Sequence, residues 1–140
     1  MRPKLVPEII CSDINQSLLF YRDLLGFEIL YSRPEDRFAY LSRDGAELML
    51  EQPFKRDRLW PKAEFIQPFG RGVNFEIKVE DVDALHTTVA GSGIECFLPL
   101  EERWYRRSNH YLGVRQFAVQ DPDGYLIRLS QSLGKRSCTS

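Results

Sequence analysis

Apolar and polar positions along the chain alternate between the period of a strand and the period of a helix. Residues 5–11 form a short apolar run that is typical of a buried strand. A helix is then predicted to begin at Asp13, which can cap it with Gln16 in the capping-box position, and to end at Gly26. Its apolar face is formed by Ile14, Leu18, Tyr21, Leu24 and Leu25.

Three further strands are predicted at Phe27–Tyr31, Arg37–Leu41 and Ala46–Glu51. The last two are joined by a turn at residues 43–45. The first part of the chain, residues 4–52, is therefore interpreted as a βαβββ module. Residues 53–72 show no clean period, although they are rich in aromatic side chains. We expect this segment to be either a linker or a loop that faces a ligand.

The same order of elements returns after this segment, over residues 73–132. Val73–Val79 is predicted to be a strand, and the helix after Asp81 has the apolar positions Val82, Leu85 and Val89. Further strands are expected at Ile94–Leu98, Arg103–Arg107, Val114–Gln120 and Tyr125–Ser130. The last two flank a tight turn at residues 121–124, for which aspartate, proline and glycine are suited. Residues 133–140 are predicted to be a flexible tail.

Landmarks of the two halves repeat at similar offsets. Asp13 and Asp81, each at a helix start, are 68 residues apart, and Gly45 and Gly124, each before a final strand, are 79 apart. Such self-similarity indicates a duplicated module. The predicted fold class is therefore α+β, with two tandem βαβββ modules in a single 140-residue domain.

Composition limits the functional classes. The formal net charge of −1 gives no electrostatic basis for binding nucleic acid, and no apolar run is long enough to span a membrane. The three cysteines are widely spaced and cannot form a disulfide framework or a thiolate zinc site. With no apolar segment typical of a secretory signal at the N-terminus, a reducing, cytoplasmic setting is expected.

Three stretches resemble the vicinal oxygen chelate superfamily, which includes glyoxalase I, extradiol dioxygenases and bleomycin resistance proteins. They are residues 12–27 (Ser-Asp-Ile to Leu-Leu-Gly-Phe), residues 48–51 (Leu-Met-Leu-Glu) and residues 121–129 (Asp-Pro-Asp-Gly-Tyr-Leu-Ile-Arg-Leu). The resemblance implies that the two modules form a curled mixed sheet with a cleft, commonly in a homodimer. It also implies that enzymes of the family hold a divalent metal with His and Glu at four strand positions.

In this chain those four positions are Val6, Asn74, Met49 and Arg128, with Glu51 as the alternative to Met49 in a shifted register. A divalent ion needs several deprotonated oxygen or nitrogen donors, and only Glu51 is a strong one. Arg128 would repel the ion. We therefore predict that no metal or other cofactor is bound, and that the chain is most similar to the bleomycin resistance branch.

The predicted function is metal-independent binding and sequestration of a small molecule, with antibiotic resistance as one role. Arg128 is expected to pair with a carboxylate, for which Glu51 is the candidate. The arginines of residues 103–107 argue against a cationic glycopeptide as the ligand. The predicted ligand-binding residues are Glu51, Asn74, Trp60, Trp104, Tyr105, His110 and Arg128.

Two alternatives remain open from the sequence. One is a lyase, isomerase or dioxygenase whose divalent metal is held by an unusual set, such as Glu51, His110 and a further carboxylate. The other is a dimeric scaffold without a small ligand, whose cleft is filled by its own side chains.

Overall fold

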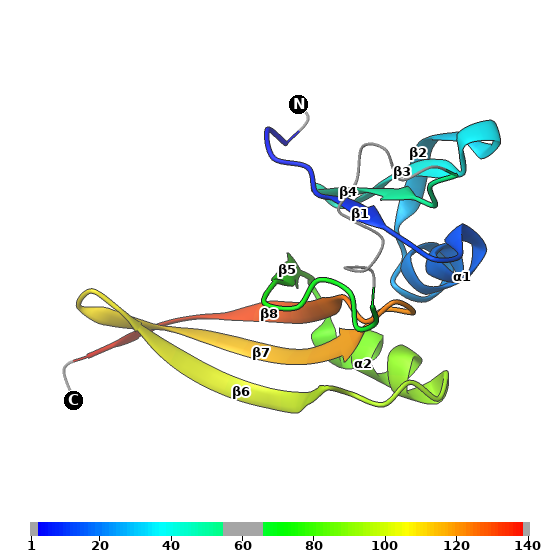
Figure 1. Cartoon of the computed structure of the whole chain (residues 1–140). Coiled ribbons are helices and arrows are strands. Elements are labelled where there is room, and N and C mark those ends of the chain that lie inside the picture. Colours follow the sequence, from blue (N-terminus) through cyan, green and yellow to red (C-terminus); the bar gives the residue numbers. More distant parts are fainter. Residues whose placement is uncertain (1–2, 55–65, 139–140) are drawn as a thin grey trace. The chain divides into compact units, whose positions relative to one another are not determined.

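The computed structural model describes residues 3–54 and 66–138, and it divides the chain into two compact units. Unit 1 comprises Met1–Arg71 together with Asp121–Tyr125, and unit 2 comprises Gly72–Gln120 and Leu126–Ser140. Each unit contains a four-stranded mixed sheet and a helical segment (Figure 1). The α+β class with two βαβββ modules is thus confirmed.

The sheet of unit 1 has the strand order β1-β4-β3-β2. Strand β1 runs parallel to β4, and the other neighbours are antiparallel. The short 3-10 helix η2 (Pro34–Asp36) connects β2 to β3. The strands are β1 (Glu8–Ile10), β2 (Glu28–Arg33), β3 (Phe38–Arg43) and β4 (Ala46–Glu51).

The helical segment of unit 1 begins where the sequence predicts it. The Asp13 side chain accepts hydrogen bonds from the backbone N–H groups of Asn15 and Gln16 and so caps α1 (Ile14–Leu18). The chain then widens into the π-helix η1 (Leu19–Leu24), where the Leu25 N–H donates to the Phe20 carbonyl at 3.0 Å. The predicted helix is therefore one continuous segment with two different hydrogen-bond patterns.

Most of the core of unit 1 lies on one face of its sheet, although Phe38 and Tyr40 of β3 are buried on the other face. Leu48 and Leu50 are buried on β4, whereas Met49 and Glu51 between and after them are only partly buried, as strand alternation requires. Ile9 and Leu41 are also buried. The apolar face of the helical segment contributes Phe20, Tyr21 and Leu25, which are at most 4% exposed.

The turn at residues 121–125 belongs to unit 1, although the strands it connects belong to unit 2. Asp121 is 5% exposed, and one of its carboxylate oxygens accepts a hydrogen bond from the Tyr21 hydroxyl at 2.7 Å. Its other oxygen accepts the backbone N–H groups of Asp123 and Tyr125, both at 2.9 Å. The acid therefore shapes its own turn and holds it to the helical segment.

Asp123, the second carboxylate of the turn, also accepts three hydrogen bonds. Asp123 is 1% exposed and accepts hydrogen bonds from the backbone N–H and hydroxyl of Ser12 and from the side-chain amide of Gln67. The Tyr125 hydroxyl donates to the Ile10 carbonyl at 2.9 Å. These bonds fix the turn against the residues that lead into α1.

The sheet of unit 2 has the order β5-β8-β7-β6, with β5 parallel to β8 and the other pairs antiparallel. Its strands are β5 (Asn74–Lys78), β6 (Leu98–Arg107), β7 (His110–Gln120) and β8 (Leu126–Ser137). The outer parts of β6, β7 and β8 extend as a long ribbon beyond α2 and β5 (Figure 1).

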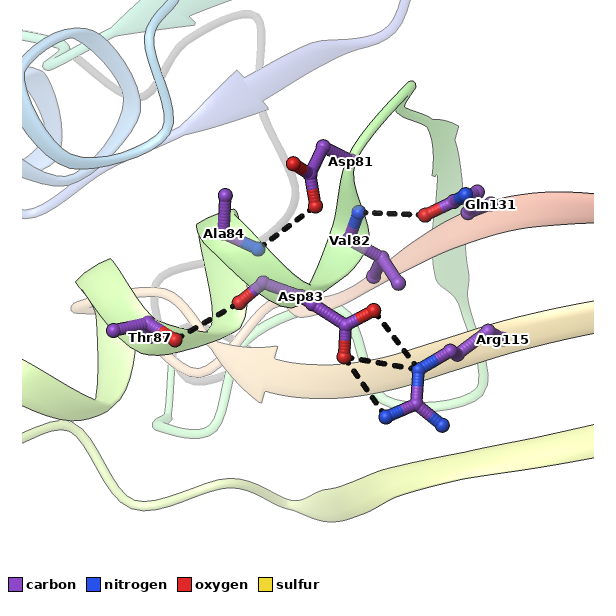
Figure 2. Close-up of polar contacts among 7 residues, drawn as sticks. All are labelled: Asp81, Val82, Asp83, Ala84, Thr87, Arg115 and Gln131. Atoms are coloured by element: carbon purple, nitrogen blue, oxygen red, sulfur yellow. Dashed lines mark hydrogen bonds and ion pairs between the residues drawn. The ribbon is translucent and has the colours of Figure 1, made fainter.

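Helix α2 (Val82–Gly91) is held to the sheet of unit 2 at its first turn (Figure 2). Asp81 caps it by accepting the Ala84 N–H, and the Gln131 side chain of β8 accepts the Val82 N–H. Asp83 forms a two-oxygen ion pair with Arg115 of β7, with a shortest distance of 2.8 Å. Polar contacts thus supplement the packing of Val82 and Val89, both fully buried.

Three predictions for the second module are wrong in extent. Ile94–Phe97 is not a strand, and a single strand, β6, spans residues 98–107 because both ends of this segment pair with β7. Strand β7 begins at His110 instead of Val114. Residues 133–137, predicted to be a flexible tail, continue β8 because they pair with the start of β7.

Gly124 should be replaceable only at a cost in stability. Its φ is +98°, and an added Cβ would lie 2.4 Å from the Cβ of Pro68. Gly134 has a similar φ of +92° but no atom within 4 Å of an added Cβ. Each Gly→Ala change should lose about 1–2 kcal/mol for the left-handed backbone, and G124A should lose more because of the clash. Urea unfolding of both variants measures this difference, and equal losses would contradict the close packing of the turn.

The stability of the protein should depend on the ionisation of Asp121. Burial raises the pKa of this carboxyl to about 6, although its hydrogen bonds oppose the shift. Because the folded-state pKa lies above the unfolded value of 3.8, the protonated acid favours folding below about pH 4, and this contribution is lost as the pH rises through 6. The loss is on the order of 2–3 kcal/mol.

Asp121→Asn removes this ionisation while keeping an oxygen that can accept the two backbone N–H groups. We expect the unfolding free energy of the wild type, relative to D121N, to fall between pH 4 and pH 7. Urea unfolding across this range measures it, and titration of the other acids cancels in the difference. A pH-independent difference would show that the turn holds Asp121 at its ordinary pKa.

Candidate functional site

One face of the unit 2 sheet carries a connected polar network around Arg128 of β8. Its guanidinium donates to the Gln116 side-chain carbonyl at 2.9 Å and lies 3.7 Å from a carboxylate oxygen of Glu76. The same Glu76 oxygen accepts the Ser130 hydroxyl at 2.9 Å. Glu76 is directly opposite Arg128 in the parallel pairing of β5 with β8. Neighbouring strands thus bring the acid and the base together.

The network continues across β7 to β6. The Gln116 amide nitrogen donates to the carboxylate of Glu101 at 2.9 Å and to the hydroxyl oxygen of Tyr105 at 3.0 Å. Gln116 is 1% exposed, so its amide is oriented by these partners instead of by water. The network therefore crosses all four strands of the sheet, from Glu76 to Tyr105.

Within unit 2, Arg128 has a carboxylate partner that was not among the predicted residues, Glu76, whereas its pairing with Glu51 stays a prediction. The sequence contained the signal for Glu76, because Glu8 and Glu76 are separated by the same 68 residues as Val6 and Asn74. In the registers of the two sheets, Glu8 lies opposite Met49 just as Glu76 lies opposite Arg128. Asn74 begins β5 and is exposed, two residues from Glu76 on the same face.

In unit 1, Glu8 forms a pair of acids with Glu51, two residues after the position equivalent to Arg128. Glu51 is hydrogen-bonded to Glu8, and this contact, together with desolvation and the charge of Glu8, raises the pKa of Glu51. Tyr31 and Tyr40 stack on this same unit with ring centroids 5.1 Å apart, and the Tyr40 hydroxyl donates to Glu47. Because Tyr40 lies opposite Met49 in the pairing of β3 with β4, the rings and acids share one face.

Trp104 does not join the network of Arg128, and its predicted role in ligand binding stays a prediction. Tyr105 shares the face of Arg128 through Gln116, and adjacent strand residues point to opposite faces. The Trp104 indole N–H accordingly donates to Glu102 at 3.1 Å, and the Arg136 guanidinium lies 3.8 Å from the ring centroid. Side chains alternate between the two faces along β6, and because β6 is one continuous strand this alternation sets the orientation of Trp104.

His110 lies apart from the network within unit 2. His110 begins β7 at the outer end of the ribbon, where its Nδ1 lies 3.3 Å from the side-chain oxygen of Asn109. In the part of the chain that is described, its Nε2 is buried without a hydrogen-bond partner. Trp60 lies outside the described residues.

The donors on these faces do not suit a divalent metal. In unit 2, Glu76 already binds Arg128 and Ser130, and the fixed positive charge of Arg128 opposes a cation. Unit 1 offers two carboxylates, Glu8 and Glu51, which share a hydrogen bond. Over residues 3–54 and 66–138, no group of three or more His, Cys, Asp or Glu side chains is placed to hold a metal ion.

Unit 1 also contains an open pocket of about 550 Å³ that the sequence did not predict. Its walls come from the start of α1, from β2 and β3 and from the segment after β4. Apolar side chains such as Ile14, Leu18 and Ile29 line it together with polar ones such as Arg37 and Gln52. The Arg37 guanidinium stacks on Phe54 at 3.8 Å from the ring centroid.

Comparison with known proteins identifies relatives across nearly the whole chain. The family model described as Glyoxalase/Bleomycin resistance protein/Dioxygenase superfamily matches residues 5–129. A bleomycin resistance protein of Geobacillus stearothermophilus is 28% identical over 137 residues, which cover 91% of this chain and 96% of the relative.

Solved structures of the same superfamily are also similar. A glyoxalase/bleomycin resistance protein/dioxygenase superfamily member from Vibrio splendidus 12B01 is 40% identical, with a TM-score of 0.43, and the match covers 91% of this chain and 97% of that one. The lactoylglutathione lyase of Agrobacterium tumefaciens is 21% identical, with a TM-score of 0.59 and coverage of 92% and 94%. The described helices include none long and apolar enough to cross a membrane.

Replacing Arg128 by Met should destabilise the protein. The change leaves Glu76 with only Lys78 as an ion-pair partner, at 3.9 Å, and leaves the buried Gln116 oxygen without its donor, at a cost of about 1–3 kcal/mol. Arg115→Met, which breaks the more exposed pair with Asp83, is the matched control and should cost less than about 1 kcal/mol. Urea unfolding of both variants measures the difference. A smaller loss for R128M than for R115M would contradict the role of the network.

Proposed function

The chain belongs to the glyoxalase/bleomycin resistance protein/dioxygenase superfamily, and on this premise we propose that it is a metal-independent member that binds and sequesters a small molecule. The observation that carries the proposal is Arg128, held by Glu76 and Gln116 at a position where the resemblance places a metal-binding carboxylate. A site organised around a paired guanidinium suits recognition by hydrogen bonds instead of Lewis-acid catalysis.

The two faces suggest what kind of ligand would bind. The network of unit 2 offers hydroxyl, amide and guanidinium groups to a polar ligand. The face of unit 1 combines the stacked Tyr31 and Tyr40 with the acids Glu8 and Glu51. Aromatic rings beside carboxylates favour a planar or cationic group. We therefore propose a polar ligand that carries such a group.

The similarity to bleomycin resistance proteins supports antibiotic sequestration as the biological role. In this role the protein would act in the cytoplasm by holding the compound stoichiometrically and would leave it chemically unchanged. Of the three arginines of β6, Arg106 lies on the face opposite Tyr105 and the network, whereas Arg103 and Arg107 share the face of Tyr105, so one of the three no longer argues against a cationic ligand.

A thermal-shift screen with bleomycin and a panel of other antibiotics, in buffer that contains a metal chelator, tests the proposal. A ligand present at 100 times its Kd adds about 2.7 kcal/mol to the stability of the folded state and so raises the Tm by several degrees. Glu51→Gln and Arg128→Met should weaken binding of the hit at least about tenfold by calorimetry, whereas the control Glu95→Gln on an exposed loop should not.

Two results would contradict this proposal. One is stabilisation only when a divalent ion is restored, followed by turnover of the compound. The other is tight binding that is insensitive to both substitutions but lost in Arg37→Met, which would move the ligand to the pocket beside α1.

A further inference from the structure

The exposed edge of the unit 2 sheet has an unusual distribution of charge. Strand β6 ends the strand order, and within the described residues it pairs only with β7. Its pairing is regular from Glu101 to Arg107, a stretch of seven residues that reads Glu-Glu-Arg-Trp-Tyr-Arg-Arg. Two acids stand at one end and two bases at the other, and Trp104 is the central residue.

We propose that this edge is a self-complementary interface on which a second copy of the chain adds its own β6 as an antiparallel strand. A two-fold axis perpendicular to the sheet at Trp104 would place Glu101 opposite Arg107 of the partner subunit and Glu102 opposite Arg106 of the partner subunit. Four ion pairs would flank the axis. The two sheets would become one continuous sheet of eight strands with α2 of each copy on the same side.

The register follows from the charges. Residues that lie opposite each other in an antiparallel pair share a face, and opposite charges in such pairs are favourable. With Trp104 at the axis, both pairs of charges are complementary, and Arg103 meets an uncharged residue, Tyr105. A parallel alignment in register would instead place acids beside acids and bases beside bases.

Three of the four residues that would pair, 102, 106 and 107, are exposed, and Glu101 is half-buried. Glu101 and Glu102 already accept hydrogen bonds from Gln116 and Trp104, and a carboxylate has further acceptor sites for a second partner. The Arg106 guanidinium donates only to a backbone carbonyl, that of Ser108, among its described contacts. Exposed strand edges are prone to pair with other chains, and charges of a single sign would prevent this by repulsion. Here the charges have opposite signs about the centre, so they favour a second copy in one register.

The interface would also reach the candidate site. Glu101 is part of the network through Gln116, so Arg107 of the partner subunit would lie at the border of that network. The inference itself rests on the edge and its charges and does not depend on the proposed function.

Paired charge reversals test the register. Glu102→Arg alone and Arg106→Glu alone each place like charges opposite each other, and each should raise the dimer dissociation constant at least about tenfold in sedimentation equilibrium at low salt. Mixing the two variants makes both cross-strand pairs complementary again. A heterodimer should therefore form with an affinity within about threefold of the wild type, and the double variant E102R/R106E should dimerise likewise. Circular dichroism checks that each variant is folded.

A cross-link tests the position of the axis. Only the residue on the axis lies opposite its own copy, at a Cα–Cα distance of about 4.5–5.5 Å, which a disulfide can span. In a Cys138→Ser background, Trp104→Cys should form a covalent dimer on oxidation, whereas Arg103→Cys should not. A wild type that stays monomeric at low salt would overturn the proposal and would indicate that the charges prevent pairing at this edge. A dimer that survives either single reversal, or a mixture that fails to associate, would also overturn it.

Discussion

The structure depends on one buried hydrogen bond, between the Tyr21 hydroxyl and the carboxylate of Asp121. Asp121 opens the turn between β7 and β8, so the strands that form the centre of one unit are joined by residues that belong to the other. Tyr21 lies in η1, where the π-helical pattern replaces the ordinary α-helical one. The turn is further held by Asp123, whose carboxylate binds Ser12 and Gln67. Two buried acids therefore act as structural groups, and neither is available for a ligand.

The order of strands has a direct consequence for function. In each module the first strand runs parallel to the last, β1 with β4 and β5 with β8. Each sheet therefore places the same two positions of its own module opposite each other. In one module the pair is Glu76 with Arg128, and in the other it is Glu8 with Met49 and the neighbouring Glu51. The duplicated fold has thus kept its geometry while the side chains have become different. One module presents a paired guanidinium, and the other presents two carboxylates beside aromatic rings.

The elements that the sequence predicted well are those with strong local signals. Asp13 and Asp81 cap the two helices as expected, and the turn at residues 121–124 is where aspartate, proline and glycine indicate it. The extent of β6 could not be predicted, because pairing with β7 and not local propensity extends it. The same holds for residues 133–137 of β8. The partner of Arg128 could be identified only from the strand register, since Asn74 and Glu76 are two residues apart on the same strand face. The orientation of Trp104 could be identified only once β6 is treated as one continuous strand.

The most direct test of metal-independent binding is the metal content of the full chain, purified without chelator and measured by inductively coupled plasma mass spectrometry. The arrangement of Arg128, Glu76 and the Glu8–Glu51 pair predicts far less than one equivalent of zinc, nickel, manganese or iron per chain. It also predicts that Glu51→Gln leaves the content unchanged. One equivalent of a divalent metal in the wild type, lost in Glu51→Gln, would contradict the account.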